Sequence, residues 1–245
     1  MELTEVGRIF LVEARRAVEQ VQKAEDVARR THRGEYGRLT IGFVGSATYG
    51  VLSEVLRRYR AQYPDVELHL TEMTTAQQAK ALRDRKIEVG FVRTPFREAG
   101  LLTKQLFTEN FVLALPASHR LCSKTEVALS ELALEPFILF PPGLGSGLYD
   151  PIIEACRLAG FTPRVAQDAT QMHTILGLTA VGFGVAIVPE CVRLLNWKGV
   201  VLKPLVEPRP RTGIALAWHA ANESSTLKAF LAQAGKKKRS TVVSQ

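Results

Sequence analysis

Hydroxyl and amide side chains gather at four places where a predicted strand passes into a predicted helix. These turns are residues 45–48, 73–75, 141–148 and 170–173. In a single turn, the simplest role of Ser or Thr is to cap the helix that follows, because the first N–H groups of a helix lack intrahelical acceptors. If the four turns face one cleft, the same groups form an anion site that suits a carboxylate.

Enzyme motifs are mostly absent. Residues 42–45 do not form the GxGxxG dinucleotide fingerprint, no Walker phosphate-loop motif follows, and residues 143–147 lack the spacing of the GxSxG nucleophile turn. The five histidines show no metal-ligand spacing; His173 follows a predicted strand and either faces the cleft or lies on a helix surface or in the core. No CxxC pair occurs among Cys122, Cys156 and Cys191. We therefore predict no catalytic residue, no metal site and no cofactor.

Alternating strands and helices must position these turns. Strands are predicted at residues 39–44, 66–70, 89–92, 101–106, 111–115, 137–140, 164–166, 185–188, 200–205 and 213–219. Helices are predicted at residues 49–63, 75–84, 147–159, 172–181 and 224–234. Such alternation indicates parallel sheets covered by helices, with ligands at the carboxyl ends of the strands. A break near residues 116–135 predicts two α/β subdomains, joined by a hinge where the last strand and helix return to the first subdomain.

A separate long helix is predicted at residues 4–31. Small or apolar residues recur in steps of four and three, at Leu3, Gly7, Phe10, Ala14, Ala17, Val21, Ala24 and Ala28. This narrow heptad seam favours a partner helix, although a helix lying on its own domain would also be amphipathic. Residues 32–37 contain two glycines and are predicted to end the helix as a hinge.

Composition sets the broad class of the protein. The 245 residues are 46% hydrophobic and 23% charged, which is typical of a globular protein. Of the net charge of +8, four charges come from residues 236–239, so we expect a solvated basic tail rather than a nucleic-acid-binding arm. No apolar run approaches the ~20 residues of a membrane span, and the charged N-terminal residues do not form a secretory signal. These features predict a cytoplasmic protein without membrane contact.

The chain resembles the LysR-type transcriptional regulators through five segments taken in order. These are LTEVGRIF at 3–10, GRLTIG at 37–42, YRAQYPDV at 59–66, EVGF at 88–91 and GFGVAIVP at 182–189. The resemblance covers about residues 2–235. Residues 41–46, 72–75 and 137–141 are most similar to the branch of the family that responds to muconate, benzoate and chlorocatechol-type compounds.

The resemblance implies an α/β fold with two Rossmann-like subdomains and a hinge. This fold is periplasmic-binding-protein-like (type 2) and follows a long linker helix. Residues 1–36 are then the linker and dimerisation helix, residues 37–235 the effector-binding domain, and residues 236–245 a basic disordered tail. Subdomain I is expected at about residues 37–115 with 216–235, and subdomain II at about residues 116–215.

The resemblance also implies an effector site in the cleft between the subdomains. Ser46 and Thr75 would bind the effector carboxylate from subdomain I. Further positions that the resemblance and the predicted turns place at the site are Ala47, Ser146, Leu148, His173 and Ile214. Arg93 either adds positive charge there or forms a surface ion pair. In the family, the loop that corresponds to residues 143–148 is richer in proline and aromatic residues. The loop here is glycine-rich instead, so it does not identify the effector.

We therefore expect the effector-sensing and oligomerising part of such a regulator. A small, aromatic-derived carboxylate would control transcription, and the linker helix would form a dimer or tetramer. The family carries a winged helix-turn-helix of about sixty residues before this helix, for which Met1 leaves no room, so DNA contact is expected only through that missing head. The alternatives are a solute-binding protein of a transporter, which uses the same cleft, and an enzyme on an α/β scaffold.

Overall fold

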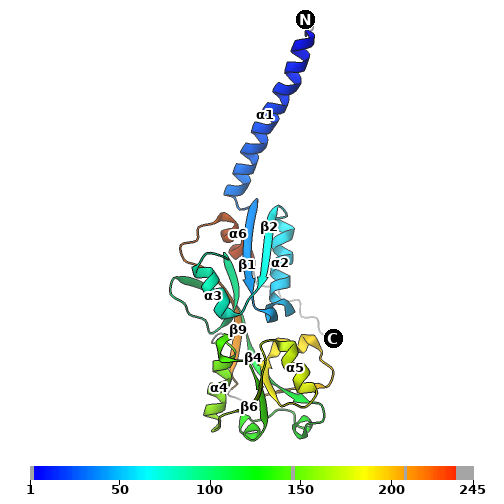
Figure 1. The fold of residues 1–245 in the computed structure, drawn as a ribbon, viewed down its shortest axis with the longest axis vertical. Helices are drawn as coiled ribbons and strands as arrows, with labels where there is room; N and C mark the ends of the chain where they lie inside the picture. Colours follow the sequence, from blue (N-terminus) through cyan, green and yellow to red (C-terminus); the bar gives the residue numbers. More distant parts are fainter. Residues whose placement is uncertain (1–2, 145–146, 207–208, 236–245) are drawn as a thin grey trace. The chain divides into compact units, whose positions relative to one another are not determined.

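The computed structural model describes residues 3–144, 147–206 and 209–235 (Figure 1). The predicted basic tail at 236–245 therefore lies outside the described residues. The helices are α1 Glu5–His32, α2 Val51–Gln62, α3 Thr75–Arg83, α4 Tyr149–Leu158, α5 Met172–Ala180 and α6 Ser225–Ala234. The strands are β1 Gly37–Phe43, β2 Val66–Glu72, β3 Val89–Thr94, β4 Leu101–Pro116, β5 Pro136–Leu139, β6 Arg164–Asp168, β7 Ala186–Pro189, β8 Val200–Pro204 and β9 Arg211–His219. The short 3₁₀ helices η1 Gly45–Tyr49 and η5 Glu190–Leu195 lie close to the site described below.

The chain divides into two compact units. The first contains residues 1–39, 58–68 and 223–245, and the second contains residues 40–57 and 69–222. In this division, parts of α2 and β2 and all of α6 group with the N-terminal helix.

The first unit is built on α1 and α6. Thr4 caps α1 by accepting a hydrogen bond from the Gly7 N–H at 3.1 Å. None of the residues of α1 is buried, and Val6, Phe10 and Val21 are each more than two-thirds exposed. After the helix, Gly34 has a φ of +73°, and a Cβ there would lie 2.4 Å from the Ser225 carbonyl oxygen. Glycine therefore allows the chain to pass close to the start of α6.

A small aromatic cluster holds the rest of the first unit together. The ring of Tyr59 meets that of Phe230 edge to face, with centroids 5.0 Å apart, and both side chains are buried. The Tyr59 hydroxyl donates to the Thr226 carbonyl at 3.4 Å. Arg30 near the end of α1 pairs with Asp65. These contacts join α1, α2 and α6 within the unit.

A mixed sheet forms the frame of the second unit. The strand order is β2-β1-β3-β9-β4-β7, and β8 also pairs with β4. β1 and β3 are parallel, as the alternation of strands and helices predicted, whereas β9 is antiparallel to both β3 and β4. A second, two-stranded parallel sheet contains β5 and β6. The two expected Rossmann-like subdomains are thus present, and β4 pairs with β9 along its first part and with β7 and β8 along its last part.

β4 differs from the prediction because it is one strand of 16 residues rather than two short ones. The sequence suggests a break because the polar residues 108–110 interrupt the apolar pattern. In the structure, the register shifts between Gln105 and Phe107. Pairing with β9 nevertheless continues through Glu109 and Asn110, opposite Thr212 and Arg211. Pairing with β9, which is distant in sequence, therefore keeps β4 extended through its polar segment.

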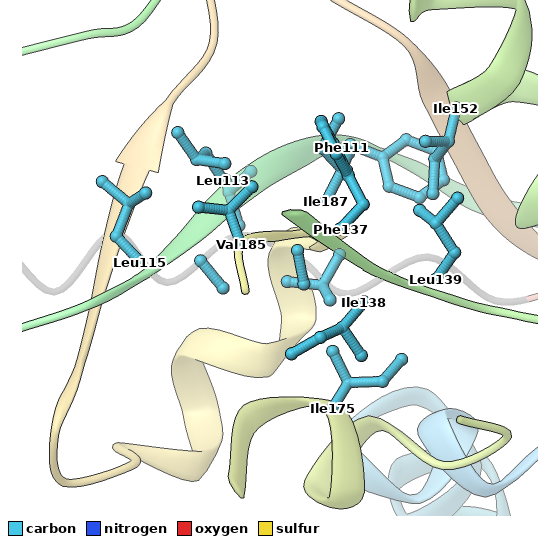
Figure 2. Packing of buried hydrophobic residues seen from close by; sticks show 14 of the residues in the cluster. Phe111, Leu113, Leu115, Phe137, Ile138, Leu139, Ile152, Ile175, Val185 and Ile187 are labelled. Atoms are coloured by element: carbon cyan, nitrogen blue, oxygen red, sulfur yellow. The ribbon is translucent and has the colours of Figure 1, made fainter. Parts of the chain in front are cut away.

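The second subdomain has a buried hydrophobic core. Figure 2 shows Phe111, Leu113 and Leu115 of β4 close to Val185 and Ile187. The intervening residues of β4, Val112 and Ala114, are also buried, so this end of β4 is covered on both faces. Burial on both faces explains why residues 111–115 form a continuous apolar run. Within the described ranges, no helix is both long and apolar enough to cross a membrane.

Candidate functional site

A cavity of about 260 Å³ lies within the second unit, between its two subdomains. The first subdomain contributes Gly45, Ser46, Glu72, Met73, Thr74 and Thr75. The second subdomain contributes Phe140, Leu148, Thr170, Gln171 and Met172. Residues from all four strand-to-helix turns identified in the sequence therefore line this one cavity.

Arg93 fixes the two hydroxyl groups of the first subdomain. Its Nη2 donates to Ser46 Oγ at 2.9 Å, and its backbone N–H donates to Thr75 Oγ1 at 3.1 Å. Both hydroxyl oxygens thus act as acceptors toward Arg93. Each hydroxyl keeps its own hydrogen, which it can donate to a group in the cavity.

The start of α3 adds backbone donors beside these hydroxyls. Thr74 and Gln77 form a capping box, in which the Gln77 N–H donates to Thr74 Oγ1 and the Thr74 N–H donates to Gln77 Oε1. Buried Gln78 fixes the helix to the sheet, since its amide donates to the carbonyls of Met73 and Phe91. The first two N–H groups after Thr74 have no intrahelical acceptor and favour an anion.

Arg93 forms a buried ion pair rather than the expected surface pair. Its side chain is 2% exposed, and Nη1 lies 2.6 Å from the Glu109 carboxylate, which is itself 9% exposed. The Cys191 backbone N–H donates to the other Glu109 oxygen at 2.6 Å. Burial requires this pairing, because an isolated charge in the protein interior is strongly unfavourable. The network joins β3, β4 and η5 directly behind Ser46.

The thiol and phenol next to this network are not activated. Burial raises the pKa of Cys191 to about 11, an effect that the positive charge of Arg93 only partly opposes. Burial also raises the pKa of Tyr49, and the nearby Cys191 and Glu72 add to this effect. Because the thiolate is the nucleophilic form of cysteine, a protonated Cys191 is a poor nucleophile at neutral pH.

The opposite side of the cavity is apolar. Phe140 and Met172 are almost fully buried, at 1% and 4% exposure, and Leu148 lies beside them. An apolar cavity of ~150 Å³ is large enough for benzene. The volume of about 260 Å³ therefore suits a molecule with one substituted ring or a chain of similar size.

The sequence-predicted site residues occupy different environments. Ser46, Thr75 and Leu148 line the cavity, whereas Ala47 is buried in η1 outside the lining set. His173 is exposed on α5, and Ile214 is buried in β9 opposite Arg93. These three residues are not among the described residues that line the cavity. Ser146 lies outside the described residues.

Sequence reasoning did not single out Glu72, Glu109 or Gln171. Glu109 lies in the polar segment between the strands predicted at 101–106 and 111–115. A charged residue in that segment was the one sequence feature that could have identified it. Glu72 directly precedes a predicted turn, and Gln171 lies inside another. Across the three described stretches, no group of three or more His, Cys, Asp or Glu side chains could hold a metal ion.

Comparison with known proteins gives the family. The family model for the LysR substrate binding domain matches residues 32–239. The transcriptional regulator AlsR of Bacillus subtilis (strain 168) is 33% identical over 231 residues, which cover 94% of this chain and 76% of AlsR.

Solved structures agree with this match. The crystal structure of CbnR, a LysR family transcriptional regulator, has a TM-score of 0.81 and 28% identity, and the match covers 95% of this chain and 81% of CbnR. The effector binding domain of BenM with its effector benzoate has a TM-score of 0.72 and 26% identity, covering 81% of this chain and 90% of that domain. The chain therefore belongs to the LysR-type transcriptional regulators and contains their substrate binding domain.

Proposed function

We propose that the cavity between the subdomains binds a small, aromatic-derived carboxylate, and that this binding controls transcription. The arrangement of Arg93 carries the proposal. Because Arg93 donates to the oxygens of Ser46 and Thr75, both hydroxyls are oriented to donate to a ligand oxygen. Two hydroxyl donors beside a helix N-terminus form a site for a carboxylate.

The apolar wall supports an aromatic-derived ligand. Phe140, Leu148 and Met172 would contact the body of the ligand, while its carboxylate faces Ser46 and Thr75. BenM, whose effector binding domain was solved with benzoate, has the same fold. Benzoate and cis,cis-muconate are therefore the first ligands to test.

Ligand binding would act through the hinge strands. β4 pairs with β9 and with β7 of the second subdomain, and Thr212 at the start of β9 bonds to Gly147 of the second subdomain, so a change in the angle between the subdomains must bend or shift these two strands. A ligand shifts such an equilibrium only by its difference in affinity for the two states. The proposed output is a change in the orientation of the two subdomains.

In an oligomer, the N-terminal helix would transmit this change in subdomain orientation to DNA. Val6, Phe10 and Val21 on α1 are largely exposed in the single chain. Pairing of two α1 helices along the predicted heptad seam would bury the seam residues Phe10 and Val21. We therefore propose a homodimer or tetramer in which α1 is a contact and DNA contact is made through the winged helix-turn-helix of the family. The relatives described above are regulators, which points away from an enzyme or a transporter component.

Thermal unfolding tests this function. At a ligand concentration of about 100 times Kd, benzoate or cis,cis-muconate should raise the midpoint by about 5–10 °C. Ser46→Ala and Thr75→Ala should each remove most of the rise, because each removes one carboxylate donor. Thr71→Ala, at an exposed position of β2, is the matched control and should keep the full rise. No rise with either acid would refute the proposed ligand class, and an unchanged rise in both variants would refute the proposed site.

A further inference from the structure

One hydrogen bond links the two subdomains at the cavity. The Gln171 Nε2 donates to Glu72 Oε1 at 3.2 Å. Glu72 is the last residue of β2 in the first subdomain, and Gln171 directly precedes α5 in the second. Both residues line the cavity, and Glu72 is exposed to solvent. The bond therefore lies where the cavity meets solvent.

Gly45 provides the space for this bond. A Cβ at Gly45 would lie 2.5 Å from Glu72 Oε1 and 3.3 Å from Gln171 Oε1. Any larger residue would therefore push Glu72 away from its present position. The glycine in the turn after β1 thus allows a third segment to approach the Glu72–Gln171 pair.

The beginning of α5 explains why an acid is favourable here. Gln171 is the N-cap residue of α5, but its side chain makes no capping hydrogen bond. The N-terminus of a helix carries partial positive charge and stabilises a nearby anion. Glu72 supplies this anion from the opposite subdomain, through its bond to the Gln171 side chain. An open cleft would separate the carboxylate from the helix.

We propose that Glu72 and Gln171 form a latch that holds the cleft closed and limits the passage of ligand into the cavity. The latch is a property of the ligand-free protein. The latch rests on the proposed function only for the identity of the ligand that enters the cavity. The hydrogen bond, rather than the charge alone, holds the two subdomains together at this point.

Hydrogen exchange of the ligand-free chain tests the latch. Glu72→Ala should speed amide exchange of residues 44–49 about fivefold, the change expected from losing one net hydrogen bond. The core amides of residues 111–115 should exchange at the wild-type rate, because the change is a local opening. Glu72→Gln should restore slow exchange, since its amide oxygen still accepts from Gln171. Thr71→Ala, on the other face of β2, is the matched control.

A double variant sharpens the test. Glu72→Ala combined with Gln171→Ala should speed exchange no more than either single variant, because all three lack the same bond. Wild-type exchange rates in Glu72→Ala would overturn the latch. An equal acceleration in residues 111–115 would also overturn it, as would a failure of Glu72→Gln to restore slow exchange.

Failure of the latch can be distinguished from failure of the proposed function. If benzoate raises the unfolding midpoint but Glu72→Ala leaves exchange unchanged, the latch is wrong and the ligand site stands. If Glu72→Ala accelerates exchange as described but neither acid raises the midpoint, the latch stands and the ligand class is wrong.

Discussion

At the scale of single residues, Arg93 has the greatest influence on the site. Its guanidinium contacts Ser46, Glu109 and Cys191, and its backbone N–H contacts Thr75. A buried arginine is stable only when its charge is paired and its N–H groups are bonded. The same contacts that satisfy Arg93 also orient the two hydroxyls of the cavity, so stability and ligand recognition depend on one side chain.

The pairing of Arg93 predicts a large effect of Glu109→Ala. This change leaves the buried guanidinium without its counter-charge, and we expect the free energy of unfolding to fall by about 3–5 kcal/mol. Urea denaturation followed by circular dichroism measures this loss. The control is Glu98→Ala, which breaks the exposed pair with Arg83 and should cost less than about 1 kcal/mol. Equal losses in the two variants would show that burial of the Arg93 pair has no special effect.

The buried thiol of Cys156 predicts a loss of stability at alkaline pH. Burial raises its pKa from 9.0 to about 11, so the folded state holds the proton more tightly than the unfolded state. The stabilising contribution is complete below pH 9 and is lost as pH rises to about 11. Urea denaturation at steps across this range should show a falling free energy of unfolding. Cys156→Ala should make the fall shallower, and an unchanged slope would contradict the assignment to this thiol.

Sequence alone indicated part of this site. The turns that contain Ser46 and Thr75 were predictable because they follow strands at helix starts, and the family resemblance singled out these two residues within the turns. Glu109 and Cys191 were not, because their relation to Arg93 depends on strand pairing and on the position of η5. Long-range pairing of this kind leaves no local pattern. The structural placement of Ala47, His173 and Ile214 outside the cavity lining likewise depends on side-chain direction.

At the scale of elements, the turn before α4 holds the second subdomain against the first. A Cβ at Gly147 would lie 2.7 Å from Arg93 Cβ and 2.9 Å from the Arg93 carbonyl carbon. The Thr212 hydroxyl donates to the Gly147 carbonyl oxygen at 2.7 Å. The turn therefore contacts β3 and β9 together. Leu148, the next residue, lines the cavity.

This close approach predicts that Gly147→Ala disturbs both stability and binding. The added methyl group must displace the turn or Arg93, and we expect a loss of about 1–3 kcal/mol in the free energy of unfolding. Benzoate should bind more weakly, because Leu148 moves with the turn. Gly143→Ala is the control, since a Cβ there meets no atom within 4 Å. Equal unfolding free energies in the two variants would show that the turn tolerates displacement at no cost.

Most elements were predictable from hydrophobic pattern and turn chemistry. The predicted helix at 172–181 is observed as Met172–Ala180, and the predicted strand at 89–92 as Val89–Thr94. The continuity of β4 was not predictable, because its polar segment is stabilised by β9, about a hundred residues later. The local sequence pattern indicates whether a segment is buried, but it does not indicate which strand completes the hydrogen bonds of that segment.

At the scale of the whole molecule, a second cavity can be compared with the cavity at Ser46. It measures about 500 Å³ and is lined by residues 128–130, by one face of α4, and by Val206, Arg209 and Pro210. This cavity is larger than the one at Ser46 but is not lined by the four strand-to-helix turns. Size alone would favour the second cavity, whereas hydrogen-bond chemistry favours the first. We expect the ligand in the first cavity, because a few converging polar groups, rather than volume alone, define a specific binding site.

Hydrogen exchange with and without a saturating concentration of benzoate tests this claim most directly. Benzoate should slow amide exchange in residues 45–48, 73–77 and 170–172, the segments that line the cavity at Ser46 and Thr75. Exchange in residues 128–130 and 154–159, which line the second cavity, should not change. Protection confined to these last two segments, or no protection in any segment, would contradict the proposed carboxylate site.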